Sequence, residues 1–177
     1  MKGFINSLFV FIYAVLFSLM EIEVEGKYGW CEKLPTPKFL GNFTIYHCIM
    51  NMIVIITLLY SFRHNLILAI FYITAWFLIE DFMWFVLNPH YTLKHYKKEN
   101  IWWHARSRWH FGIPEHNFIG VGVIILAYIL SGNKNELNLA IISFIVFSFF
   151  IISVSDYYHS FYNKTHECFK SDLNSDK

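Results

Sequence analysis

The chain has 177 residues, of which 56% are apolar and 20% aromatic, and its mean hydropathy is +0.40. The length fits one domain, and a composition this apolar excludes an ordinary soluble domain and indicates an integral membrane protein. A formal net charge of +1 leaves no surface field of a single sign, which argues against a nucleic-acid-binding protein. Cys31, Cys48 and Cys168 show no CxxC spacing, so neither a thiolate zinc site nor a disulfide framework is predicted.

The first apolar stretch, residues 4–20, follows a single lysine, as in a signal peptide. The sequence EIEVEG comes directly after it, where a signal peptide would have a small-residue cleavage site. A helix needs about 20 apolar residues to span a membrane, and about 17 are tolerated, so the stretch is long enough. We therefore expect a first helix that is retained in the mature protein.

Three further stretches satisfy the same length rule: residues 43–62, 66–87 and 137–154. A fifth, residues 118–130, is short, but the residues before it or a thinned bilayer would let it span. The polar linkers at 63–65 and 131–135 contain turn-forming residues, so the helices that they join should pack antiparallel.

The prediction is an all-α integral membrane bundle of five, alternatively four, transmembrane helices in a single domain, with an aromatic interfacial loop at 88–117 and a polar tail at 157–177. Threading five helices alternately across the bilayer puts Lys2, Arg63 and Lys134 on one side and every other lysine and arginine on the opposite side. By the positive-inside rule, the N-terminus should be outside and the C-terminus cytoplasmic.

Two adjacent carboxylates, Glu80 and Asp81, interrupt the apolar stretch 66–87. Glu80 lies about seven residues before the helix end, which at 1.5 Å per residue is roughly 10 Å inside the polar boundary. A charge at that depth costs several kcal/mol unless it is paired, coordinated or protonated, and it indicates a functional site. Neighbouring helix positions point about 100° apart, so the two acids cannot face one narrow seam but can both border a cavity.

Other predicted helix ends bring polar side chains to the same depth. Three pairs are spaced to share one face of their helix: Glu21 with Glu25, His47 with Asn51, and Asp156 with His159. Carboxylates and imidazoles that point inward from several helices resemble, in ligand type, the dimetal sites of helical bundles.

The sequence therefore predicts a metal site whose four to six ligands come from Glu21, His47, Glu80, Asp81, His90, His104, Asp156 and His159. Mixed imidazole and carboxylate ligation suits zinc or non-haem iron. Zinc would activate water for hydrolysis with a spare carboxylate as general base, and two irons would allow oxygen-dependent oxidation of an acyl chain. Glu80, Asp81 and His104 are the predicted catalytic residues of an enzyme that acts on a lipid or other hydrophobic substrate at the cytoplasmic face.

The loop at 88–117 carries five histidines among three tryptophans, and indole rings favour the headgroup level of a bilayer. We expect the loop to lie against the membrane over the polar cavity, with its basic residues facing anionic lipids. Four histidines are expected to be exposed and not ligands: His95, His110, His116 and His166.

Three alternatives remain open at this point. Glu80 and Asp81 can be a buried polar cluster that fixes helix register, and Asp156 with His159 can be a solvated helix end. The chain can be a small transporter or channel in which Glu80, Asp81 and Asp156 bind a cation or relay protons. It can also be a non-catalytic membrane effector or scaffold whose polar face binds a partner protein.

The motifs EVEGKYGWCEKLPTP, EDFMWFVLNPHY and IWWH resemble a family of small multi-pass bacterial membrane proteins, over most of the chain. The resemblance implies a bacterial inner membrane location and brings no activity with it. The chain does not match the HxxxH and HxxHH boxes of membrane desaturases, because His90 and His95 form an HxxxxH and no two histidines are adjacent.

Overall fold

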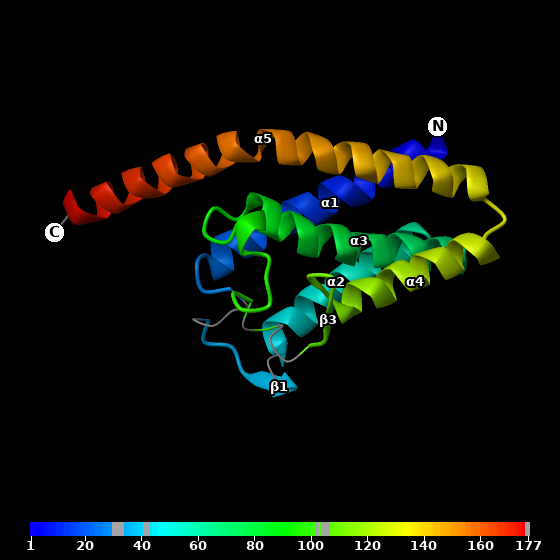
Figure 1. Cartoon of the computed structure of the whole chain (residues 1–177), viewed down its shortest axis with the longest axis horizontal. Coiled ribbons are helices and arrows are strands. Elements are labelled where there is room, and N and C mark those ends of the chain that lie inside the picture. The colour runs from blue at the N-terminus through cyan, green and yellow to red at the C-terminus, as the bar shows by residue number, and fades with distance from the viewer. Residues whose placement is uncertain (30–33, 41–42, 102, 104–106, 176–177) are drawn as a thin grey trace.

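The computed structural model describes residues 1–29, 34–40, 43–101, 103 and 107–175. Within this part of the chain five α-helices follow one another (Figure 1): α1 Lys2–Glu25, α2 Ile45–Ser61, α3 Leu66–Leu87, α4 Glu115–Leu130 and α5 Lys134–Ser175. The shorter elements are the 3-10 helix η1, Leu93–His95, and two antiparallel pairs of strands, β1 (Lys38–Leu40) with β2 (Phe43–Thr44) and β3 (Trp109–His110) with β4 (Ile113–Pro114).

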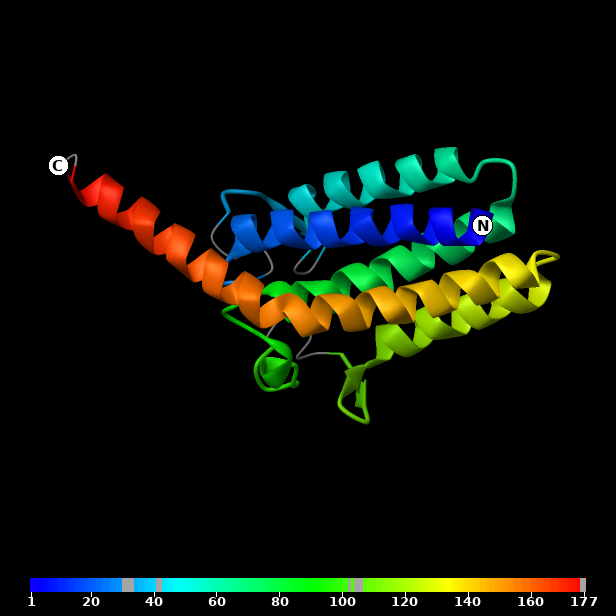
Figure 2. The same ribbon diagram turned by 90° about the horizontal axis from the view of Figure 1, so that it is seen from above.

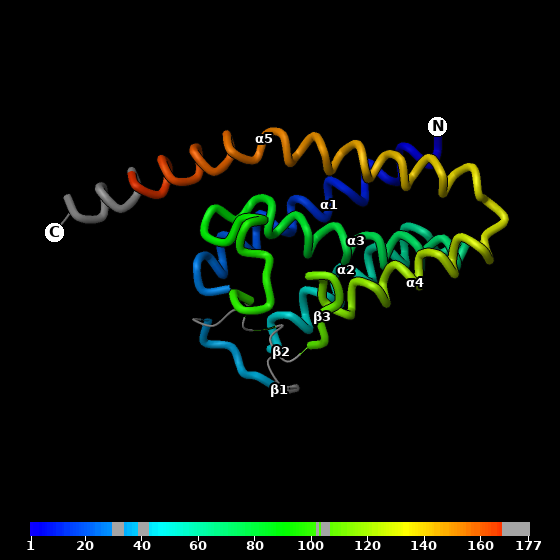
Figure 3. The backbone as a smooth tube through the Cα atoms, viewed as in Figure 1, coloured from blue at the N-terminus to red at the C-terminus, as the bar shows by residue number. Residues whose placement is uncertain are grey.

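Helix α3 is the centre of the bundle, because it packs against all four other helices. The hairpins α2–α3 and α4–α5 and the first helix lie alongside one another, and the N-terminus lies near the turn between α4 and α5 (Figure 2). A hydrogen bond of 2.7 Å from Asn6 Nδ2 to Glu136 Oε1 joins these two regions. The backbone path in Figure 3 shows α5 continuing past the other helices at the opposite end.

The sequence explains the central position of α3, because this helix is apolar around most of its circumference and such a helix is stable only when it is buried on all sides. The largest fully buried side chains include Phe71, Tyr72, Trp76 and Phe85 of α3. At its start the Asn65 side chain accepts a hydrogen bond from Leu68 N at 3.0 Å, which caps the first turn.

In the part of the chain that the structure describes, three helices are long and apolar enough to cross a membrane, namely α1, α3 and the Lys134–Glu167 part of α5. The apolar helices α2 and α4 are shorter, with 17 and 16 residues. The outer faces of α4 and α5 expose large apolar side chains, including Ile125, Ile129, Ile145 and Phe149. An exposed apolar surface of this extent is typical of contact with lipid or with another protein. The predicted mostly helical chain is confirmed.

Several helix ends differ from those predicted by apolar runs alone. Helix α1 continues to Glu25, α4 begins at Glu115, and α5 continues without a break to Ser175, through the segment predicted as a polar tail. The physical reason for the last difference is that residues 155–175 contain neither proline nor glycine, so nothing in the sequence ends the helix there.

Candidate functional site

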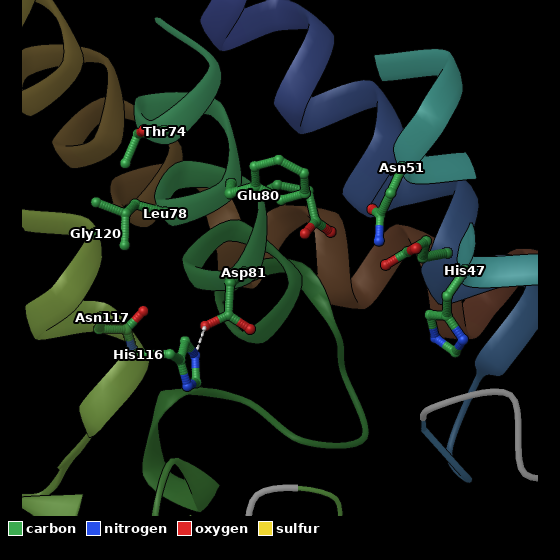
Figure 4. Close-up of a pocket in the computed structure, with 11 residues that line it drawn as sticks. His47, Asn51, Thr74, Leu78, Glu80, Asp81, His116, Asn117 and Gly120 are labelled. Carbon is green, nitrogen blue, oxygen red and sulfur yellow. Dashed lines mark ion pairs between the residues drawn. The ribbon is translucent and has the colours of Figure 1, made fainter. Parts of the chain in front are cut away.

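A cavity of about 320 Å³ lies between α1, α2, α3 and α4 (Figure 4). Its lining consists of Glu21, His47, Asn51, Thr74, Phe77, Leu78, Glu80, Asp81, His116, Asn117 and Gly120. The volume falls within the range of small-molecule sites in proteins. Among the described residues, the lining contains acids, histidines and amides but neither lysine nor arginine, so it offers no strong positive charge to balance its carboxylates.

Helix α3 presents two carboxylates to different parts of this cavity. Thr74, Phe77, Leu78 and Asp81 follow the i, i+3, i+4, i+7 spacing of one helix face, which is turned toward α4. Glu80 is about 100° away around the helix, and Figure 4 shows its side chain directed toward Asn51 of α2. Both acids therefore line the cavity although they are adjacent in sequence.

The carboxyl group of Glu21, on α1, lies within hydrogen-bonding reach of the carboxyl group of Glu80. Two carboxyl groups can share a hydrogen bond only if one carries a proton, and two ionised ones this close repel each other, which a bound cation would relieve. Glu80 Oε1 is buried and has no hydrogen-bond partner among the described residues. At the same level Ser18 Oγ donates to the Glu80 backbone carbonyl at 3.0 Å, which holds α1 against α3.

His47 is held on one side of the carboxylates by a second acid that was not among the predicted ligands. Its Nε2 lies 3.5 Å from Glu25 Oε1, and both side chains are buried. Its Nδ1 lies 2.7 Å from Thr44 Oγ1, and Thr44 also caps α2 by accepting from His47 N. When the Thr44 hydroxyl donates to Nδ1, Nε2 carries the proton and faces Glu25.

His116 lies on the opposite side, on the first turn of α4, with its Nε2 3.7 Å from Asp81 Oδ2 (Figure 4). The next residue, Asn117, donates from Nδ2 to the Tyr96 hydroxyl at 2.9 Å. Burial, with a smaller contribution from the nearby charge of Asp81, raises the pKa of Tyr96 above its usual value, so this hydroxyl stays neutral.

The carboxylates also border a smaller cavity of about 50 Å³. It is lined by Glu21, Glu25, Glu80, Asp81, Trp84, Phe85 and Trp103. Trp84 is 4% exposed, and its Nε1 has no hydrogen-bond partner among the described residues. A polar cavity of this size is large enough for a water molecule between the indole N–H and a carboxylate.

Four of the eight predicted metal ligands line the larger cavity: Glu21, His47, Glu80 and Asp81. Three others lie elsewhere. His159 Nε2 is 3.0 Å from the Val86 carbonyl oxygen, His90 packs edge-on against Tyr162, and Asp156 is exposed on α5. The eighth, His104, lies outside the described residues.

Helix position explains which predicted ligands converge. The cavity is enclosed by α1 to α4, whereas α5 packs on α1 and α3 without contributing to the lining. The two histidines at the cavity pair with different carboxylates on opposite sides of it. Among the described residues, no three His, Cys, Asp or Glu side chains are close enough together to hold a metal ion. A metal cofactor therefore stays a prediction.

Sequence reasoning missed several lining residues. His116, 43% exposed at its side chain, was expected as an exposed loop histidine but lies in α4. Gly120 is four residues after His116 and three after Asn117, spacings that put each of them beside Gly120 on the helix surface, and this was the available signal. Gly120 matters because a Cβ there would lie 2.9 Å from Leu78 Cδ2, so the glycine permits the close approach of α4 to α3.

Comparison with known proteins adds no assignment, since no family model, no curated protein and no solved structure matches the chain. The functional argument therefore depends on the geometry and chemistry of the acid-lined cavity.

Proposed function

We propose that the chain is a five-helix integral membrane protein that binds a small organic cation in the acid-lined cavity and carries it across the membrane. The observation that supports this proposal most strongly is the shared location of Glu21, Glu80 and Asp81, from two helices, in one cavity whose described lining lacks lysine and arginine. Carboxylates deep in a helical bundle that no lysine or arginine balances favour a positively charged ligand.

The lining also indicates which chemical class of ligand would fit the cavity. Phe77 and Leu78 form an apolar wall, and the carboxylates of Glu80 and Asp81 face the same space. A cation with an apolar group can place its charge near the acids and its apolar part against this wall. A volume of about 320 Å³ suits a small quaternary or primary ammonium compound better than a lipid.

The membrane location is supported by three helices of spanning length and by the exposed apolar faces of α4 and α5. At 1.5 Å per residue α2 is about 25 Å long, which a locally thinned bilayer accommodates. We propose the orientation with the N-terminus outside and the C-terminus cytoplasmic, because that threading puts most basic residues inside.

A metal-dependent enzyme acting on a hydrophobic substrate is the second candidate. It is favoured by one specific observation, that Glu21, His47 and Glu80 line one cavity from three different helices. They offer the ligand types that zinc or iron prefers, and such a metal would supply Lewis-acid or redox chemistry, but the described side chains would first have to move closer together to hold it. Glu25 is placed to orient the imidazole of His47.

The test is calorimetric titration of the detergent-purified full chain with benzyltrimethylammonium. Benzyl alcohol and benzoate serve as neutral and anionic probes with the same ring. We expect binding of the cation only. Glu80→Gln should weaken it by at least about tenfold, since a unit charge about 5 Å away at an effective dielectric of about 20 contributes about 3 kcal/mol. Glu99→Gln, at an exposed position outside the cavity, is the matched control and should bind normally.

Equal binding of all three probes, or none by a folded protein, would overturn the cation proposal. Metal analysis of the same preparations addresses the second candidate. Near-stoichiometric zinc or iron that is lost in Glu80→Gln and retained in Glu99→Gln would favour the metalloenzyme. A folded chain that binds neither cation nor metal would direct attention to the effector hypothesis.

A further inference from the structure

An aromatic side chain stands at the tip of the β3–β4 hairpin, in a backbone conformation that is unfavourable for it. Phe111 is 98% exposed and has a φ of +52°, and Gly112 follows with a φ of +80°. Two successive positive φ angles in a two-residue hairpin turn are typical of type I′, whose first central position is usually Asn, Asp or Gly. A bulky residue there indicates a role outside the folding of the hairpin itself.

Ring contacts fix the level of this hairpin along the bundle. Trp109 of β3 packs on Tyr96 with ring centroids 5.8 Å apart, and Tyr96 packs on Phe85 in the last turn of α3 at 4.6 Å. The base of the hairpin is closed by a 2.9 Å hydrogen bond from Glu115 N to the Arg108 carbonyl. The hairpin therefore lies level with the end of α3 and projects sideways from the start of α4 (Figure 2).

Exposed apolar residues lie near the tip in sequence, and exposed basic residues lie at the hairpin base and earlier in the loop. Ile113 of β4 and Phe118 and Ile119 of α4 are exposed, so the apolar surface continues from the hairpin onto the outer face of α4. Arg108 is exposed at the hairpin base, and Lys97 and Lys98 are exposed in the same loop. Aromatic side chains with nearby cations suit the boundary between anionic headgroups and acyl chains.

We propose that the β3–β4 hairpin is a lipid anchor that inserts Phe111 into the headgroup and acyl boundary of the bilayer beside α4. The anchor fixes the start of α4, and hence His116 and Asn117, relative to the membrane surface. This inference rests on the membrane location in the proposed function, but it does not depend on which ligand the cavity binds.

The test uses single cysteines labelled with the fluorophore NBD, in a full chain whose Cys31, Cys48 and Cys168 are replaced by serine. The labelled chain is reconstituted in vesicles of phosphatidylcholine and phosphatidylglycerol. Three sites are compared: Phe111→Cys at the hairpin tip, Ile125→Cys on the exposed face of α4, and Asn163→Cys on the exposed side of α5, in its polar part after the apolar run 137–154. Quenchers are doxyl-labelled lipids and aqueous iodide.

We expect lipid doxyl groups to quench the label at position 111 at least threefold more strongly than the label at 163, with iodide showing the reverse order. Doxyl quenching at 125 but not at 111, with iodide reaching 111, would overturn the lipid anchor and leave the membrane location intact. Absence of doxyl quenching at 125 as well would instead overturn the membrane location, and with it the proposed function.

Discussion

Two glycines on α4 provide a sharp test of how this helix packs on α3. A Cβ at Gly120 would lie 2.9 Å from Leu78 Cδ2 and 3.2 Å from Leu78 Cγ, whereas a Cβ at Gly122 would have nothing within 4 Å. Both residues are in the same helix, so replacing either by alanine brings the same gain of about 0.5–1 kcal/mol in backbone propensity. Only Gly120→Ala adds a steric conflict.

The size of that conflict follows from what the new methyl group meets. Its nearest neighbours are side-chain atoms of Leu78, which can shift, so the cost should lie toward the lower part of the usual overpacking range, about 1–2 kcal/mol. We expect Gly122→Ala to stabilise the protein by about 0.5–1 kcal/mol and Gly120→Ala to lie about 1–2 kcal/mol below it. For a chain of this length the difference corresponds to about 2–8 °C in Tm.

Thermal unfolding in one detergent, followed by circular dichroism, measures both variants against the unmodified chain. Gly120 also lines the larger cavity, so Gly120→Ala should weaken benzyltrimethylammonium binding while Gly122→Ala leaves it unchanged. If both alanine variants are stabilised equally, α4 does not approach α3 as described. The conclusion that α4 forms one wall of the cavity would then be wrong.

Three further predictions concern single side chains. Asn88→Ala should lower the free energy of unfolding by about 1–3 kcal/mol, because this buried amide donates to the Gly26 carbonyl and its Oδ1 accepts from His90 N. An unchanged midpoint in denaturant titration would contradict this prediction. Phe111→Asn should raise Tm slightly in detergent, since asparagine tolerates a positive φ, and a fall in Tm would argue for a structural role of the ring. His159→Ala should lower the free energy of unfolding by about 1 kcal/mol, because it removes the contact with the Val86 carbonyl, and should leave cation affinity unchanged. Loss of cation binding in calorimetry would instead show that His159 belongs to the site.

Depth along a helix was predictable from the sequence, whereas the direction in which a helix faces was not. Counting residues from the helix ends put Glu21, His47 and Glu80 at a common level, because rise per residue is constant, and all three line the larger cavity. The same counting placed Asp156 and His159 at that level, but α5 packs on the side of α1 and α3 away from the cavity. That arrangement follows from tertiary packing, and the spacing of apolar residues within α5 does not indicate which helices it packs against.

The residues around His116 show a second limit. Apolar content alone began this helix at residue 118, so the polar first turn of α4 was assigned to the loop. Glu115 and His116 are in fact helical. An acidic residue such as Glu115 is favourable at a helix N-terminus, but a search for apolar stretches does not detect this signal. Once that turn is included, the helical spacing of His116 and Gly120 indicates the face they share, although not its partner.

The uninterrupted course of α5 has a practical consequence for any experiment that attaches something to the C-terminus. At 1.5 Å per residue its 42 residues form a rod about 63 Å long. The rod is braced where it leaves the bundle, because His166 Nε2 lies 3.0 Å from Glu23 Oε2 of α1 and its ring stacks on Tyr162. A fluorescent protein joined directly to Ser175, without the last two residues, would continue from this helix, so energy transfer from it to a membrane dye would depend on the direction of α5.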